Sequence, residues 1–240
     1  MLPGTADVRL VLASCHDAAA RTLAERWGPA RTVLVTPADL SQPGWAHSVG
    51  RGGDGATAAA GGRVLAADEL DGVVVRIAAV PVGELGHVRA EDRGYAAAEM
   101  TAFLLAWLDA CPCPVVNRPT PGCLNGPPWR KAQWAHAAAA VGLPVAAAGR
   151  DGAGEEGAPT GRDGAGEVIA TVVGERCLGG AHPRRTDQAR RLAARAGVDL
   201  LAVRFGGAGP DAPFLGADVW PDVADLAVAD ALDARLAAGC

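Results

Sequence analysis

The sequence predicts an α/β protein with a parallel sheet in its N-terminal half. An apolar run at residues 8–13 is followed by a segment with helical spacing and then by a second apolar run at 31–36. This succession is typical of a β-α-β unit, whose two strands lie parallel. The run G-V-V-V-R-I at residues 72–77 shows no polar alternation, so it predicts a strand covered on both faces.

The N-terminal half is expected to alternate strands and helices. The first strand ends in Ser14-Cys15-His16-Asp17, and Asp17 is predicted to cap a helix through Trp27, since aspartate is a preferred N-cap. The further elements are a strand at 31–36, a Gly- and Ala-rich excursion at 41–62, a short return strand near 63–65, the central strand at 72–77, a helix at 94–110, a strand at 114–117, a Pro- and Gly-rich loop at 118–128 and a helix at 129–141.

The composition changes after residue 148. Residues 149–167 carry R-D-G-A-G-E twice and no large apolar residue, which predicts a flexible linker. The sequence beyond predicts a hairpin at 168–178, a helix at 185–196, strands at 199–205 and 214–218, and a last helix at 222–238. The expected domains are therefore 1–148 and 168–240, joined by the linker 149–167.

The net charge and the composition limit the classes of partner that we expect. The net charge of −5 argues against nucleic acid and acidic membranes, because both require a positive surface. No apolar run reaches the ~20 residues that span a bilayer, and residues 1–7 lack the features of a secretory signal, so we expect a cytoplasmic protein. The six cysteines show no metal-ligand spacing, and small buried thiols are expected.

Several local patterns recur in one known family. A helix of the form basic-x-x-Gln, with Arg130 and Gln133, runs into G-L-P-V at 142–145. Further on come V-V-G-E-R at 172–176, G-V-D-L at 197–200 and a strand that leads into Trp220-Pro221. This order resembles the ATP-grasp ligases, particularly the glutathione-synthetase-like enzymes and the ligases that crosslink ribosomally made peptides. The first 148 residues are similar to their pre-ATP-grasp domain, and the last third is similar to the end of their catalytic domain.

The resemblance implies an activity that this sequence is poorly equipped to perform. ATP-grasp chemistry needs lysines on the nucleotide phosphates, acidic residues that hold Mg²⁺, and a lid that excludes water. The lid belongs between Val145 and Val168, where the linker-like segment lies, and Lys131 is the only lysine of the chain. The resemblance thus implies a truncated, degenerate homologue that lacks the nucleotide-clasping lid.

The metal positions implied by the resemblance are also altered. An alignment on Trp220-Pro221 places Gly216 and Asp218 at the Glu-x-Asn pair of the family, and Arg204 near another acidic ligand. A guanidinium at a metal position repels Mg²⁺. Asp218 is therefore only a weak metal candidate, and we expect no metal and no cofactor.

Two groups of candidate ligand-binding residues lie at the ends of predicted elements. Cys15 and His16 follow the first strand, and they either form a nucleophile pair or are structural neighbours of the capping residue Asp17. Arg130 and Lys131 begin a helix behind a Pro-rich loop. With the adjacent tryptophans they either grip a phosphate or a peptide or form an ordinary helix start.

A third group surrounds the arginine of the central strand. Arg76 lies between apolar residues, and a buried guanidinium needs a carboxylate partner. Glu99 or Asp92 could supply it, with Tyr95 on the same predicted helix. The group is either an ion pair that fixes the fold or part of a ligand site.

The sequence therefore predicts a non-catalytic binding or scaffold protein with a protein or peptide partner, in a pathway that modifies peptides or amino acids. One alternative is an ATP-dependent carboxylate-amine ligase completed by another chain. The other is a small-molecule enzyme that uses Cys15 and His16. The oligomeric state is open, and a homodimer is among the options.

Overall fold

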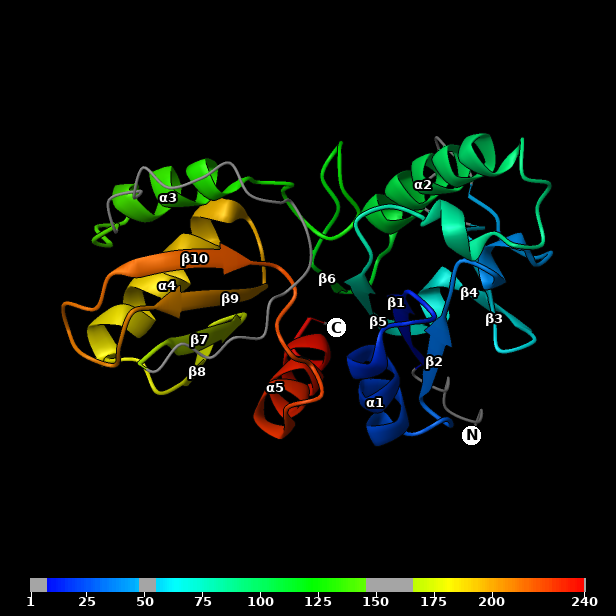
Figure 1. The fold of residues 1–240 in the computed structure, drawn as a ribbon. Helices are drawn as coiled ribbons and strands as arrows, with labels where there is room; N and C mark the ends of the chain where they lie inside the picture. The colour runs from blue at the N-terminus through cyan, green and yellow to red at the C-terminus, as the bar shows by residue number, and fades with distance from the viewer. Residues whose placement is uncertain (1–7, 48–54, 146–165, 240) are drawn as a thin grey trace, which may run out of the picture. The chain divides into compact units, whose positions relative to one another are not determined.

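The computed structural model describes residues 8–47, 55–145 and 166–239 (Figure 1). The chain forms two compact units, one of Met1–Pro128 together with Asp222–Cys240 and one of Trp129–Pro221. These units differ from the expected division, because the helix before the linker belongs to the second unit and the last helix to the first. The predicted linker lies outside the described residues except for its last two positions.

The first unit contains a four-stranded parallel sheet in the order β2-β1-β5-β6. Its strands are β1 (Val8–Ala13), β2 (Thr32–Val35), β5 (Leu70–Arg76) and β6 (Val115–Val116). The predicted parallel sheet is confirmed. The chain goes from β1 to β2 on one side and later returns to β5 on the other, so the strand order reverses at β1 and β5. In α/β sheets, ligands gather at the carboxyl ends of the strands at such a point.

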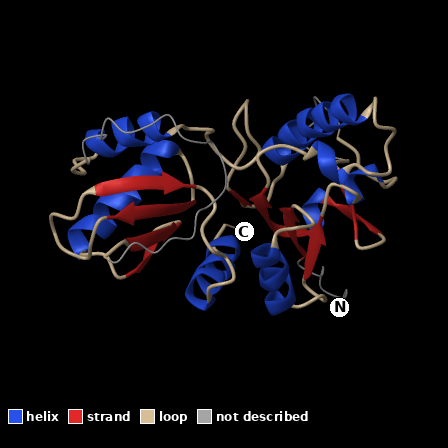
Figure 2. Cartoon of the chain, viewed as in Figure 1, coloured by secondary structure: helices blue, strands red, loops and turns tan. Residues whose placement is uncertain are grey.

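Helices cover both faces of this sheet, as the valine run predicted. They are α1 (Ala18–Trp27), α2 (Arg93–Ala110) and α5 (Leu226–Ala237). On one face Leu10 and Val73 pack with Trp107 of α2. Helices α1 and α5 lie on the opposite face (Figure 2). The backbone of Gly72 in β5 approaches α5 so closely that a Cβ there would lie 2.7 Å from Leu236 Cδ2.

A small hairpin and three short 3-10 turns complete the first unit. The excursion expected to hold one short return strand contains two antiparallel strands, β3 (Thr57–Ala60) and β4 (Arg63–Ala66). The turns are η1 (Asp39–Ser41), η2 (Ala67–Glu69) and η3 (Val82–Glu84). No helix among the described residues is long and apolar enough to cross a membrane.

The second unit is an antiparallel sheet in the order β10-β9-β7-β8. Its elements are α3 (Lys131–Ala140), β7 (Val168–Val173), β8 (Arg176–Gly179), α4 (Pro183–Ala196), β9 (Leu200–Phe205) and β10 (Phe214–Asp218). The predicted hairpin is confirmed as β7 and β8.

One face of this antiparallel sheet forms the core of the second unit. Val203 and Ala217 pack there with Leu192 of α4 and Trp134 of α3. Successive side chains of a strand point to opposite faces. The residues next to the two core positions, among them Arg204, therefore lie on the other face of the sheet.

Candidate functional site

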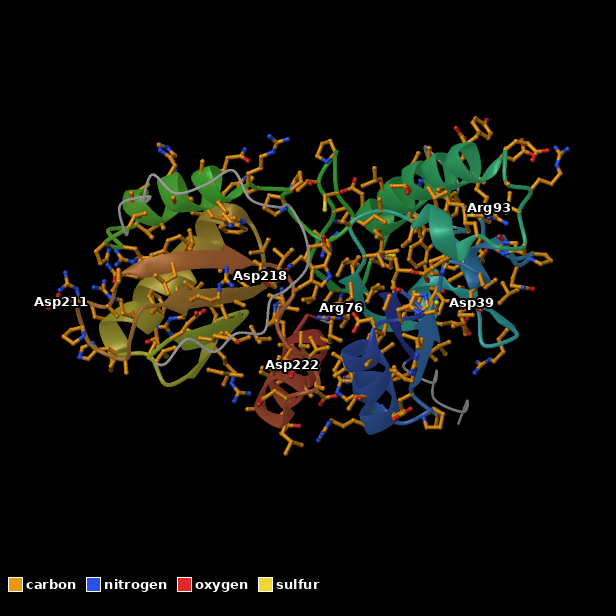
Figure 3. All side chains as sticks on the ribbon, viewed as in Figure 1. Asp39, Arg76, Arg93, Asp211, Asp218 and Asp222 are labelled. Atoms are coloured by element: carbon orange, nitrogen blue, oxygen red, sulfur yellow. The ribbon has the colours of Figure 1, made fainter. Side chains whose placement is uncertain are left out.

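The carboxyl ends of β1 and β5 are joined by a buried ion pair. Arg76 Nε donates to Asp17 Oδ2 over 2.7 Å. The other carboxylate oxygen of Asp17 accepts from the backbone N–H of Ala20 over 2.9 Å, which confirms the predicted N-cap. The sequence suggested Glu99 or Asp92 as the carboxylate partner of Arg76. The partner in the structure is Asp17. Figure 3 shows Arg76 at the end of the parallel sheet.

Neither Asp92 nor Glu99 contacts Arg76. Asp92 lies 2.6 Å from a guanidinium nitrogen of Arg89. Glu99 lines a groove of about 330 Å³ on the exposed side of α2. Tyr95 lies one turn before Glu99 and is 71 % exposed. Neither Asp92 nor Glu99 is therefore the carboxylate partner of Arg76.

Cys15 and His16 are exposed, and the group that faces the thiol is a carboxylate. Glu84 of η3 accepts from the backbone N–H of Cys15 over 2.8 Å. Its hydrogen bond with the thiol raises the pKa of Cys15 above the ordinary value, and its negative charge acts in the same direction. A nucleophilic cysteine needs the thiolate at neutral pH. Glu84 therefore disfavours the alternative in which Cys15 and His16 form a nucleophile pair.

The carboxylate of Glu84 is itself held by the end of β1. Burial alone would raise the pKa of Glu84, but hydrogen bonds from Ser14 and Cys15 outweigh it and lower the pKa. Glu84 could not be predicted as a neighbour of Cys15, because it lies 69 positions away in the sequence and in no motif. The signal available was its place just after a predicted central strand.

Arg130 and Lys131 lie at the start of α3, and both are exposed. Gln133, the glutamine of the basic-x-x-Gln pattern, accepts from the backbone N–H of Arg130 over 2.8 Å and so caps the helix. Trp134 is buried and packs edge to face on Trp129, with ring centroids 4.8 Å apart. The tryptophans and the glutamine thus have structural contacts, whereas the two cationic side chains extend into solvent.

Arg204 and Gly216 are neighbours across β9 and β10. Arg204 Nη2 lies only 2.9 Å from the place that a Cβ at position 216 would occupy. Its Nε lies 3.7 Å from a carboxylate oxygen of Glu167. Asp218, near the end of β10 (Figure 3), accepts from the backbone N–H of Trp220 over 2.9 Å. The guanidinium therefore fills the space in which a longer side chain at position 216 would lie.

This set of residues does not fit a bound Mg²⁺. The ion prefers near-octahedral coordination by oxygen atoms, and proteins usually supply carboxylates for it. The resemblance places metal ligands at or near positions 204, 216 and 218. These positions hold the guanidinium of Arg204, Gly216 and the carboxylate of Asp218, which already accepts a backbone hydrogen bond. Nowhere in the described ranges do three His, Cys, Asp or Glu side chains gather in a way that could hold a metal ion. Cys111, Cys113 and Cys123 are buried free thiols.

The parallel α/β unit and the antiparallel sheet backed by two helices were compared with known proteins. No family model and no curated protein sequence matches the chain. Among solved structures, the ATP-grasp ligase PsnB complexed with a minimal precursor superimposes with a TM-score of 0.61 at 14 % identity, covering 97 % of this chain and 99 % of that one.

Two further structures show the same likeness. The macrocyclase MdnC from Microcystis aeruginosa MRC, bound with the precursor peptide MdnA, has a TM-score of 0.62 at 13 % identity over 97 % of this chain and 100 % of that one. A RiPP-associated ATP-grasp ligase of Chryseobacterium gregarium, in complex with ADP and a leader and core peptide, has a TM-score of 0.58 at 11 % identity over 96 % and 95 %. At such identities the likeness shows the fold, which agrees with the resemblance stated from the sequence.

Proposed function

We propose that this chain is a non-catalytic ATP-grasp homologue that binds a peptide partner and acts as a scaffold in a peptide-modifying biosynthetic pathway. The observation that carries the proposal is the guanidinium of Arg204, which lies against Gly216 where the resemblance places a metal-binding glutamate. A glutamate at position 216 would require the end of this side chain to move aside.

The electrostatics of this arrangement oppose catalysis. Phosphoryl transfer in this chemistry depends on metal ions that bridge phosphate oxygens and neutralise the developing charge. A positive charge where the resemblance places a metal ligand repels a divalent cation. The chain also has a single lysine, Lys131, for contacts with phosphate. The predicted loss of the lid falls on residues outside the described ranges and stays a prediction.

The peptide partner is proposed from the structural relatives. PsnB is complexed with its minimal precursor, MdnC with the precursor peptide MdnA, and the Chryseobacterium ligase with a leader and core peptide. These likenesses extend over nearly the whole chain, so a peptide is the ligand class that the fold supports best. Fold alone does not fix function, and for this reason the catalytic and the binding parts need separate tests.

Calorimetric titration of the full chain with ATP and Mg²⁺ tests the non-catalytic part. We expect no saturable heat up to millimolar nucleotide. Saturable binding in the micromolar range would overturn the proposal. In that case Arg130→Ala and Asp218→Asn, which alter the remaining candidate contacts, should weaken the binding if it uses the ATP-grasp site, as a ligase completed by another chain requires.

A further inference from the structure

An aromatic groove lies on the outer side of α2, at the candidate residue Glu99. Glu99, Met100 and Phe103 of α2 line it on one side, and Leu40 and Trp45 line it on the other. Its volume is about 330 Å³. Ligand pockets range from about 300 to 1,000 Å³, so this groove lies at the lower end of the range and can hold one large side chain.

The aromatic wall of the groove is held in place from behind. Trp45 Nε1 donates to the backbone oxygen of Asp39 over 3.0 Å. The Trp45 ring packs edge to face on Phe103 and on Trp107, with ring centroids 6.1 and 5.4 Å apart. Trp107 is fully buried in the core of the first unit. A surface tryptophan anchored in this way forms a preorganised wall, which lowers the entropic cost of binding.

The negative charge of Glu99 favours a cationic ligand in the groove. Glu99 is exposed at the rim, and within the described residues no arginine, lysine or histidine lies within ion-pair distance of it. The cation nearest in sequence, Arg93, donates instead to the backbone oxygens of Val88 and Gly86. Aromatic faces attract cations, and a carboxylate at the rim adds to that attraction.

We propose that this groove receives an arginine side chain of the peptide partner. The Trp45 and Phe103 rings stand perpendicular to each other, so the planar guanidinium can stack on one of them while it donates two parallel hydrogen bonds to the carboxylate of Glu99. The inference rests on the proposed function in that the arginine belongs to a peptide, and it names the recognition element that such a peptide must carry. Tyr95, one turn before Glu99 and exposed, extends the same face of α2 for neighbouring peptide residues.

Binding of a single-residue probe tests the groove directly. Nα-acetyl-arginine methylamide is titrated into the isotope-labelled full chain, and the indole N–H signals are followed by NMR, with the Trp45 signal assigned from Trp45→Phe. We expect a saturable shift of the Trp45 signal. The citrulline analogue has the same shape without the charge and should bind about tenfold more weakly, the effect of losing a charged hydrogen bond.

The variant Glu99→Gln should bring the affinity for arginine down to that for citrulline. Glu25→Gln, an exposed glutamate on α1, is the matched control and should leave both affinities unchanged. No shift at tens of millimolar probe would overturn the proposal, as would equal binding of the norleucine or lysine analogues. Failure here leaves the non-catalytic proposal intact, whereas nucleotide binding would overturn that proposal and leave the groove unaffected.

Discussion

Buried and half-buried arginines have different polar partners in the two units. In the first unit Arg9 and Arg76 each contact aspartate. In the second unit Arg185 is buried and donates to the amide oxygen of Gln188, and burial lowers the pKa of its guanidinium. Arg204 reaches a carboxylate only at 3.7 Å. A buried charge is stable where an opposite charge and hydrogen bonds compensate its loss of water. The arginines of the first unit have such compensation from aspartates. Those of the second unit have a neutral amide or a distant carboxylate instead.

Arg9 illustrates the complete case. Its Nε lies 3.0 Å from Asp71 Oδ2 in β5, and Nη1 contacts Asp233 in α5. Its guanidinium carbon also lies 5.1 Å from the ring centroid of Trp27 in α1. One side chain of β1 thus connects three further elements of the unit. Among the described residues, the ion pair of Arg204 is the long contact with Glu167.

The largest expected effect is on stability when these two arginines are changed. Arg9→Met removes the buried cation that contacts Asp71 and Asp233 and should lower the free energy of unfolding by about 3–5 kcal/mol. Arg204→Met removes only a long, partly exposed ion pair and should change it by about 1 kcal/mol or less. Urea unfolding followed by tryptophan fluorescence measures both. Equal losses would show that Arg204 is structural, which would remove the contrast between the units.

Alanine substitutions at two glycines, one in each unit, should have effects on stability of intermediate size. A Cβ at Gly72 would lie 2.7 Å from Leu236, and a Cβ at Gly216 would lie 2.9 Å from Arg204. Leu236 is fully buried, so Gly72→Ala should cost about 1–3 kcal/mol through overpacking. The end of the Arg204 side chain can move into solvent, so Gly216→Ala should cost about 0.5 kcal/mol or less. Thermal unfolding measures both; a large loss at Gly216 would mean that the guanidinium is rigidly held.

Local patterns predicted most of the fold. The valine run of β5 requires cover on two faces, Asp17 is a strong capping residue, and Gly174-Glu175 marks the turn between β7 and β8. These features depend on residues close in the sequence. The grouping of α5 with the first unit was not predicted, because it depends on the contact of Gly72 with Leu236, far apart along the chain.

The site was less predictable for the same reason. The resemblance identified Arg204 and Gly216 as altered positions, and the structure adds that they face each other across two strands. The choice of Asp17 as the partner of Arg76 could not be made from sequence, since several carboxylates were eligible and the two residues are 59 positions apart. The groove likewise combines Trp45 with a helix that begins at Arg93, and no local pattern connects them.

The smallest expected effect concerns two cysteines, one in each unit. Glu84 raises the pKa of the exposed Cys15 thiol through a hydrogen bond, whereas burial raises the pKa of Cys177 to about 11. A group held protonated by a neighbouring carboxylate should respond when that carboxylate is neutralised, and a group held protonated by burial should not. The two thiols therefore separate the two causes within one molecule.

Alkylation with iodoacetamide, read by peptide mass spectrometry across a pH series, follows both thiols at once. Both should react slowly at neutral pH and faster as pH rises, because the thiolate is the nucleophile. Glu84→Gln should shift the profile of Cys15 to lower pH and speed its neutral-pH alkylation several-fold, while the midpoint of Cys177 stays near 11. If Cys15 reacts fast in the unaltered chain, Glu84 does not suppress the thiolate, and the small-molecule enzyme that uses Cys15 and His16 becomes the better account of the first unit.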